Sequence, residues 1–474
     1  MDTLPPEKFN NYPAEKFPLD AGFREAIPHD ANDGRSFYDA LADLPMGQIL
    51  RVPAKETAAV WFKLDSHGIK PGVYKSSIVF KSATEGFANE IIPLEVEVLP
   101  IDLGKIEIDT ALYNYIQARF VNVRKAPKDE LLKLLVEREV NYLFCNVPGD
   151  VDMDIYPPQD ANGNPGKCDF THLDNNINAY VKAGMSLKRM KLWFYLAMNY
   201  PGYVLTSNGK HTLLKEFSPQ WEKALKSFYD QLFPHLEKKY GITPDRVAFC
   251  VVDEPCGDYN DPKSSAYLAC KYAKVLRRIA PKARLMANPY DLKDDAVTRN
   301  NLSKLAECFD IIQPYSGQLT PALVKFIKDL NFKEYWTYNI LQKIHTPDAY
   351  ILKLWENMAN GFSTMSPYWH VDQADGQDGL CAFDVDTNYG VRRNDYASIF
   401  CDFTSGKGIV SRRQEAFYLG GQDAKLIILC RKLAKGRPEA AQVEELVAKG
   451  ASGDMQIIAE CREKLLDIAL KLSK

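Results

Sequence analysis

The pattern of hydrophobic and polar residues divides the chain near residue 103. Before this point the chain contains short segments rich in β-forming residues, which are Trp61–Leu64, Val73–Phe80 and Leu94–Leu99. The last of them alternates apolar and acidic residues, as a half-buried antiparallel strand does. Pro71-Gly72 supplies a turn between the first two. We therefore predict a small β-sandwich domain over residues 1–103.

From about residue 106 onward, strand-like and helix-like segments alternate, which is typical of a parallel sheet. The predicted strands are Thr110–Ile116, Asn141–Val147, Met190–Leu196, Arg246–Asp253, Ala283–Pro289, Phe309–Tyr315, Glu334–Asn339 and Phe362–Trp369. Each strand is followed by a helix-like or helix-capable segment. Among these are the amphipathic stretches Asp129–Glu139, His172–Ala183, Trp221–Lys239, Lys263–Ile279, Ala322–Leu330 and Tyr350–Asn360, and the eighth helix is predicted at Arg412–Leu433. Eight such units favour an α/β fold of the (β/α)8 TIM-like barrel type over residues 104–474, with a helical tail from Pro438. An open doubly wound sheet is the alternative.

Two adjacent carboxylates end the fourth predicted strand. Asp253 and Glu254 follow an uncharged, mostly apolar run, and Pro255 stops the strand. Catalytic groups of such barrels lie at the C-terminal ends of the strands. Two neighbouring carboxylates at the buried end of a strand are costly, because both are poorly hydrated and they repel each other. The pair is therefore our candidate catalytic site; the alternative is that Asp253 caps the next helix and Glu254 pairs with an arginine.

Aromatic and amide side chains lie at the ends of the other predicted strands. Rings at the mouth of a barrel stack on sugar faces, and amides bind hydroxyl groups. For each ring taken alone, ordinary core packing is the alternative. We predict that one carbohydrate-binding cleft contains the acid pair together with Tyr195, Asn288, Gln313, Tyr315, Trp336, Tyr338 and Trp369.

Composition and charge exclude several classes of function. The chain has 59 basic and 62 acidic residues and no basic block, so we expect no nucleic-acid partner. It has no apolar run of about 20 residues, so we expect no membrane span. Neither metal-binding spacings of histidine nor a glycine-rich phosphate loop is present, and we therefore expect no metal and no cofactor. The segment Asp160–Asn164 begins like a calcium loop, but Pro165 and Thr171 occupy the positions of its glycine and bidentate acid.

Several stretches together resemble the catalytic region of glycoside hydrolase family 123 and its uncharacterised relatives. They are Trp61-Phe62-Lys63-Leu64, Lys70–Ser76, Val252-Asp253-Glu254-Pro255, Gly361-Phe362 through Tyr368-Trp369, and Ser411–Ala416 through Gly420-Gly421-Gln422-Asp423. The similarity extends from about residue 40 to about residue 435. It implies a (β/α)8 barrel enzyme whose substrate is a carbohydrate.

Characterised members of this family are β-N-acetylgalactosaminidases that retain configuration by substrate assistance. The resemblance implies that Glu254 is the general acid/base. It implies that Asp253 holds the 2-acetamido N–H while the acetamido carbonyl attacks C1, and that Tyr315 or Tyr338 donates to the acetamido oxygen. It also implies an extracellular or periplasmic location. The start Met1–Pro6 shows no signal peptide, and ten scattered cysteines favour a reducing compartment.

The segment after the eighth predicted strand departs from the family pattern. It reads Trp369-His370-Val371-Asp372, where many relatives carry an asparagine and a further tryptophan. This departure leaves the sugar specificity open. The alternatives are a glycosidase of different specificity without acetamido participation and a non-catalytic carbohydrate-binding barrel.

Overall fold

The computed structural model describes a defined set of residues in two compact units. The described residues are 23–25, 38–41, 60, 62, 64, 66, 68–82, 86–112, 128–146, 156–196, 203–205, 211–339, 347–367, 398–402 and 407–473. The first unit is formed within residues 1–108, 346–359 and 409–474, and the second within residues 109–345 and 360–408. The acid pair belongs to the second unit.

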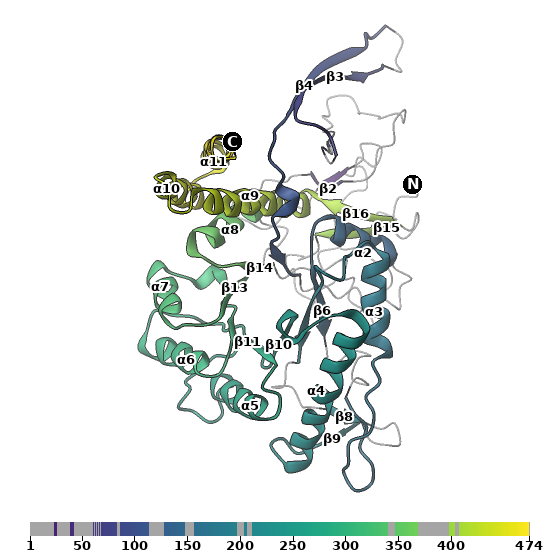
Figure 1. Cartoon of the computed structure of the whole chain (residues 1–474), viewed down its shortest axis with the longest axis vertical. Helices are drawn as coiled ribbons and strands as arrows, with labels where there is room; N and C mark the ends of the chain where they lie inside the picture. Colours follow the sequence, from purple (N-terminus) through teal and green to yellow (C-terminus); the bar gives the residue numbers. More distant parts are fainter. Residues whose placement is uncertain are drawn as a thin grey trace. The chain divides into compact units, whose positions relative to one another are not determined.

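A curled parallel sheet forms the centre of the second unit (Figure 1). Its strands are β5 (Asp109–Thr110), β6 (Tyr142–Asn146), β7 (Lys191–Tyr195), β10 (Val247–Cys250), β11 (Arg284–Ala287), β12 (Ile311–Ile312), β13 (Glu334–Asn339) and β14 (Thr364–Pro367). They lie in the order β6-β7-β10-β11-β12-β13-β14-β5, and every pair of neighbours is parallel. Each predicted strand is thus found in part, and the α/β class is confirmed. Complete closure of the sheet into a barrel stays a prediction.

Side chains on the concave face of the sheet show how strongly it curls. Tyr142 of β6 and Trp336 of β13 have ring centroids 5.0 Å apart, although four strands separate β6 from β13 in the sheet order. Trp193 of β7 contacts the same tryptophan at 6.5 Å. The two edges of the sheet also approach each other, because the Asn141 backbone N–H donates to the Thr110 carbonyl (3.2 Å). Residues at alternate strand positions therefore pack into one interior core, as in a barrel.

Helices follow the strands of the second unit on its outer side. They are α2 (Lys128–Glu137), α3 (Thr171–Lys182), α4 (Pro219–Tyr240), α5 (Ser265–Ile279), α6 (Ala296–Ala306) and α7 (Pro321–Asp329). Side-chain caps begin four of them, at Ser218, Ser264, Asp295 and Thr320. The segment after the fifth predicted strand, expected only to be helix-capable, forms α6; its core-facing residues are few, and Asn300-Asn301 interrupts the apolar pattern. A short antiparallel pair, β8 (Tyr203–Leu205) and β9 (His211–Leu213), lies between β7 and α4 in the chain.

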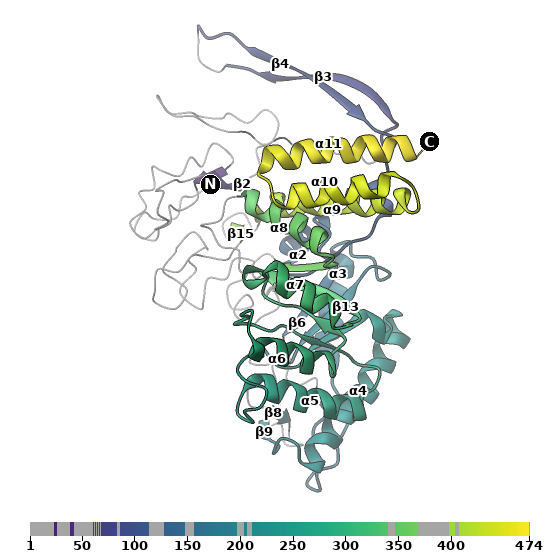
Figure 2. The same cartoon turned by 90° about the vertical axis from the view of Figure 1, so that its left-hand side faces the viewer.

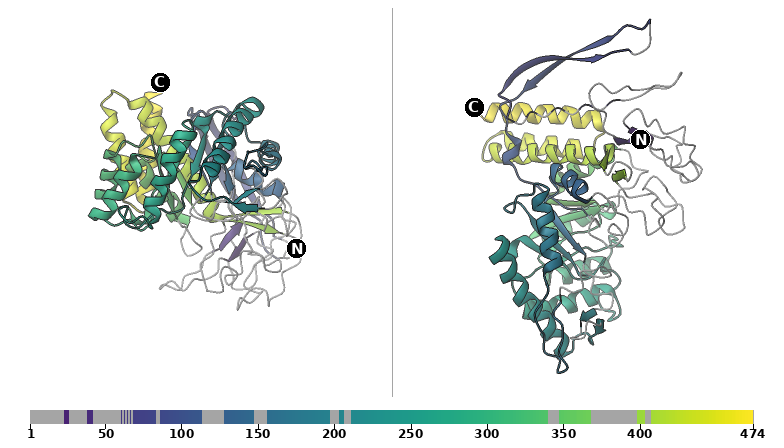
Figure 3. Two further views of the ribbon diagram at one scale, coloured as in Figure 1. Left: turned by 90° about the horizontal axis from the view of Figure 1, so that it is seen from below. Right: turned by 90° about the vertical axis from the view of Figure 1, so that its right-hand side faces the viewer.

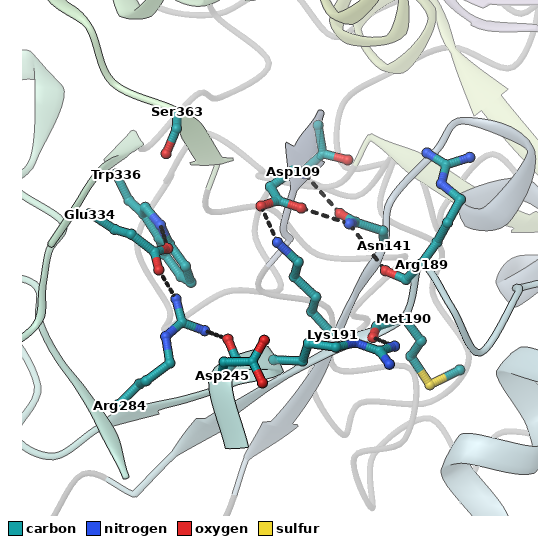
Figure 4. Close-up of polar contacts among 12 residues, drawn as sticks. Asp109, Asn141, Arg189, Met190, Lys191, Asp245, Arg284, Glu334, Trp336 and Ser363 are labelled. Atoms are coloured by element: carbon teal, nitrogen blue, oxygen red, sulfur yellow. Dashed lines mark hydrogen bonds and ion pairs between the residues drawn. The ribbon is translucent and has the colours of Figure 1, made fainter. Parts of the chain in front are cut away.

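Paired charges and amides occupy the N-terminal ends of the strands (Figure 4). Lys191 forms an ion pair with Asp109 (2.5 Å), and Asn141 Nδ2 donates to the same carboxylate (2.9 Å). Arg284 pairs with Glu334, which also accepts a hydrogen bond from the Trp336 indole (3.1 Å). This end of such a sheet contributes to stability, whereas active sites lie at the opposite end.

Antiparallel strands and four helices make up the described part of the first unit. Strands β3 (Gly72–Phe80) and β4 (Glu90–Val98) form a long twisted hairpin (Figure 3). Strand β1 (Phe23–Glu25) pairs with β2 (Tyr38–Leu41), and β2 pairs with Val410 and Ser411 of β16 (Lys407–Ser411). The hairpin confirms two of the three predicted strands, while the sandwich and the boundary at residue 103 stay predictions. Strand β15 spans Ile399–Asp402 in the second unit.

The helices of the first unit are α8 (Pro347–Asn360), α9 (Arg412–Ala434), α10 (Glu439–Ala451) and α11 (Met455–Leu472). Helices α9, α10 and α11 pack side by side (Figure 2). Asp423 of α9 links this helix to α8 and α11, because it accepts hydrogen bonds from Trp355 of α8 and from Arg462 of α11 (2.6–2.9 Å). Helices α10 and α11 lie within the predicted helical tail, whose place in the barrel domain stays a prediction. Within the described residues, no helix combines the length and hydrophobicity that crossing a membrane requires.

Candidate active site

The acid pair lies immediately beyond the C-terminal end of β10. Cys250 is the last residue of that strand, and Asp253 and Glu254 are both half-buried. Glu254 has a φ of 44°, in the left-handed region that non-glycine residues rarely adopt. Such a conformation costs about 1–3 kcal/mol and clusters at functional sites. The backbone therefore turns sharply at the acid itself.

Tyr338 binds the carboxyl group of Glu254. Its hydroxyl donates to Glu254 Oε1 at 2.6 Å, and the tyrosine is only 2% exposed. Tyr338 belongs to β13, three strands away from β10 in the sheet order. Glu254 thus reaches across the end of the sheet rather than out into solvent.

Asn288, the residue after β11, contacts both acids. Its Oδ1 accepts a hydrogen bond from the Glu254 backbone N–H (3.2 Å), and its Nδ2 donates to Asp253 Oδ1 (3.1 Å). The asparagine is 1% exposed. This buried amide bonds the side chain of Asp253 and the backbone of Glu254. It therefore fixes the positions of the two acids relative to each other.

The two acids have different environments. Burial raises the pKa of Glu254; the hydrogen bond from Tyr338 opposes this shift, and the charge of Asp253 adds to it. Burial also raises the pKa of the Cys250 thiol beneath the pair, with the charges of Asp253 and Glu254 contributing. Asp253 Oδ1 accepts a hydrogen bond from the amide N–H of Asn288. Glu254 is accordingly the group suited to retain a proton.

We expect Glu254→Gln to raise the melting temperature at neutral pH. Between about pH 4.3, the ordinary glutamate pKa, and the raised pKa in the fold, the unfolded chain has lost a proton that the folded protein retains. Stability therefore falls as pH rises through this window, and glutamine, which cannot ionise, removes that cost. Thermal unfolding at pH 7 and at pH 4 checks this: the gain should be present at pH 7 and absent at pH 4.

The exposed Glu307 provides a control for this comparison, because its side chain forms an ion pair with Lys304 at the surface. Glu307→Gln should change the melting temperature little at either pH, since exposed pairs contribute little. An equal gain for Glu254→Gln at both pH values would show that ionisation of Glu254 is not its cause.

A row of three tyrosines extends from Glu254 toward the surface. Tyr338 contacts Tyr315 at 5.3 Å between ring centroids, and Tyr315 contacts Tyr290 at 5.5 Å. Exposure rises along the row, from 2% at Tyr338 to 36% at Tyr290. Gly317 makes room for the middle ring, because an added Cβ there would lie 2.8 Å from it. Tyr290 was not predicted, although its position directly after Asn288-Pro289 at a strand end could have indicated it.

The structure places the other predicted site residues differently. Trp336 is 0% exposed and bonds Glu334 near the opposite end of the sheet, so the prediction that it lines the cleft is wrong. Its side chain faces the interior as Tyr338 does, but two residues deeper. Gln313 is also fully buried, and Tyr195 is half-buried against Phe144 (5.8 Å). Trp369 lies outside the described residues.

The alternative roles weighed for the acids do not match the contacts. The side chain that caps helix α5 belongs to Ser264, so Asp253 is not the cap. The group that bonds the Glu254 carboxyl is a tyrosine hydroxyl, not an arginine. The loop after the acids is anchored instead by Asn301, which accepts from the Tyr259 backbone N–H (2.9 Å) and donates to the Gly257 carbonyl. In the part of the chain that the structure describes, no group of three metal-binding side chains occurs.

Comparison with known proteins identifies the fold. No family model matches the chain, and no curated protein matches it. A solved structure of a family 123 glycoside hydrolase from Clostridium perfringens, which was studied for glycolipid glycan hydrolysis, matches with a TM-score of 0.61 and 10% identity. The match covers 97% of this chain and 86% of that one. The chain shares its fold with a family 123 glycoside hydrolase.

The likeness to family 123 that the sequence predicted is thereby confirmed for the fold. A family 5 mannosidase from Rhizomucor miehei matches over 78% of this chain and 95% of its own, with 13% identity and a TM-score of 0.37. An intracellular xylanase from Thermoanaerobacterium saccharolyticum matches over 66% and 96%, with 12% identity and a TM-score of 0.39. Both scores are well below that of the family 123 structure, on which the assignment of the fold rests.

Proposed function

We propose that this protein is a retaining glycoside hydrolase that cleaves β-linked 2-acetamido sugars, of the N-acetylgalactosaminide type, by substrate assistance. The observation that carries the proposal is the unequal environment of two adjacent acids beyond the end of β10. Glu254 is buried against Tyr338 with a raised pKa, whereas Asp253 accepts an amide N–H from Asn288. Acids and bases whose environments differ in this way divide the work of catalysis. The family 123 fold supports the same assignment.

In the proposed reaction Glu254 is the acid and then the base. It donates its proton to the glycosidic oxygen as the bond from that oxygen to C1 breaks. The carbonyl oxygen of the substrate's own acetamido group bonds to C1 and gives an oxazolinium ion. Glu254 then removes a proton from water, which attacks C1 and reopens the ring. Two displacements at C1 retain its configuration, and no enzyme nucleophile is required.

Asp253 has the complementary role in this proposal. Its carboxylate accepts the acetamido N–H, which orients the carbonyl toward C1 and stabilises the positive charge that develops on the ring. Asn288 donates a hydrogen bond to one of its oxygens and so orients the carboxylate. Because Tyr338 bonds the acid Glu254, we favour Tyr315 as the donor to the acetamido oxygen. The row Tyr338, Tyr315 and Tyr290 then forms a wall for the sugar.

A panel of nitrophenyl glycosides tests the proposal. Each β-glycoside that carries a 2-acetamido group is compared with its 2-hydroxy counterpart, and release of nitrophenol and the anomer formed first are measured. We expect turnover of acetamido sugars only, with the β anomer as first product. Equal turnover of a 2-hydroxy sugar would indicate a glycosidase without acetamido participation. Binding without turnover would indicate a carbohydrate-binding protein; either result contradicts the proposal.

A further inference from the structure

Asn288 is a buried residue that forms hydrogen bonds with both acids. Asn288 accepts two hydrogen bonds at Oδ1, one from the Glu254 backbone N–H (3.2 Å) and one from the Cys250 thiol (3.3 Å). A backbone N–H can only donate, so the amide oxygen must face Glu254. The amide nitrogen then faces Asp253 Oδ1, which accepts from it at 3.1 Å. The hydrogen-bond network thus fixes the orientation of the amide.

Asn288 thus contacts three residues at or just beyond the end of β10, which are Cys250, Asp253 and Glu254. The Cys250 contact ties the amide to the end of β10, and the Glu254 contact holds the residue whose backbone is left-handed. The Asp253 contact fixes one carboxylate oxygen and thereby sets the direction of the other. Asn288 is 1% exposed, so water does not compete for these bonds.

We propose that Asn288 is a positioning residue that orients Asp253 toward the substrate's acetamido group and holds Glu254 at the proton-donating distance. This inference rests on the proposed function. Asn288 touches no reacting atom; it acts through the two acids. A displacement of about 1 Å of a reacting group can cost on the order of 10²-fold in rate. The loss of Asn288 should therefore lower kcat far more than it changes the binding of the ground-state sugar.

The N-terminal end of the sheet offers a matched control. Asn141 is 4% exposed, and its Oδ1 accepts a backbone N–H, that of Thr110 (2.9 Å). Its Nδ2 donates to the carboxylate of Asp109 (2.9 Å), as Figure 4 shows. Asn141 thus makes the same kinds of contact as Asn288, but at the end of the sheet away from the acids. A merely structural role would make the two asparagines equivalent.

The test compares Asn288→Leu with Asn141→Leu in the full chain. For each variant we measure the melting temperature, kcat and KM on a nitrophenyl β-2-acetamido glycoside, and the affinities for the free acetamido sugar and for a thiazoline analogue of the oxazolinium ion. Both variants should melt lower than wild type. Only Asn288→Leu should lose about 10²-fold in kcat, with KM within about threefold. Its thiazoline affinity should fall in parallel, while the affinity for the free acetamido sugar is retained.

A second variant covers the case in which Asn288→Leu does not fold. Asn288→Asp keeps the shape of the side chain and an acceptor for Glu254 and Cys250, but its carboxyl can donate to Asp253 only while protonated. Its activity optimum should therefore move to lower pH than that of wild type. An unchanged optimum together with unchanged thiazoline affinity would overturn the inference and leave the proposed function intact. Wild type that neither hydrolyses the glycoside nor binds the thiazoline would overturn both.

Discussion

Glu254→Gln should slow the hydrolysis of alkyl and sugar glycosides by about 10²–10⁴-fold, the usual contribution of general acid catalysis. These leaving groups cannot depart without a proton, and glutamine has none to give. Acidic phenols such as dinitrophenol depart from aryl glycosides without a proton. For these substrates the step that forms the oxazolinium ion should therefore remain close to the wild-type rate. The measurement is kcat/KM across a series of leaving groups of graded pKa, for wild type and variant. In the variant, kcat/KM should fall much more steeply with rising pKa of the leaving group than in wild type.

The neighbouring Asp258 supplies the control for this experiment. It lies four residues after Glu254 in the same loop and is exposed. Asp258→Asn removes one negative charge near the site without touching the acid pair, and the dependence on the leaving group should stay that of wild type. A uniform loss across all leaving groups in Glu254→Gln would show that Glu254 is not the proton donor.

Asp253→Asn should reduce the hydrolysis of every acetamido glycoside, whatever its leaving group. The variant removes the negative charge that stabilises the oxazolinium ion, and this ion forms regardless of which group departs. Loss of one preorganised electrostatic contact at a transition state costs about 10²–10³-fold. The same leaving-group series measures this effect. Asp253→Asn should give a parallel downward displacement, in contrast to the change of slope in Glu254→Gln.

Binding of the thiazoline analogue provides a second readout for Asp253. Asp253→Asn should weaken it strongly, since the ring nitrogen of the analogue, once protonated, would no longer face a carboxylate, whereas Glu254→Gln should weaken it less. If both variants gave the same kinetic profile and the same thiazoline affinity, the separate roles assigned to the two acids would be incorrect.

The strands of the sheet were predictable because their hydrophobic runs are continuous. The segment Val247–Cys250 is fully buried on both faces, as strands of a parallel sheet are, and such runs are visible without a structure. The acids were found by the rule that chemistry lies at the C-terminal ends of these strands. Helix α6 was expected only as a helix-capable segment without bounds, because its few apolar residues give a weak periodicity.

The sequence indicated which strand each candidate residue belongs to better than it indicated how far along the strand axis its side chain lies from the acids. Trp336 and Tyr338 share one face of β13, but only Tyr338 is at the level of the acids. The sequence does not show how far each strand extends past its neighbours. The role of Asn288 depends on the same information, because the pairing of Cys250 with Met286 brings the residue two positions after Met286 beside the acids. An amide at a strand end was predicted to bind sugar hydroxyls, whereas the structure shows it bound to the acids.

In the proposed mechanism, the acetamido oxygen of the substrate is the nucleophile that attacks C1. Replacing the acetyl group by mono-, di- and trifluoroacetyl groups weakens this oxygen stepwise while the sugar and the leaving group stay the same. The measurement is kcat/KM for the four nitrophenyl glycosides. Substrate assistance predicts a steep fall with each fluorine, to barely detectable turnover for the trifluoroacetyl substrate. Equal rates across the four substrates would contradict it.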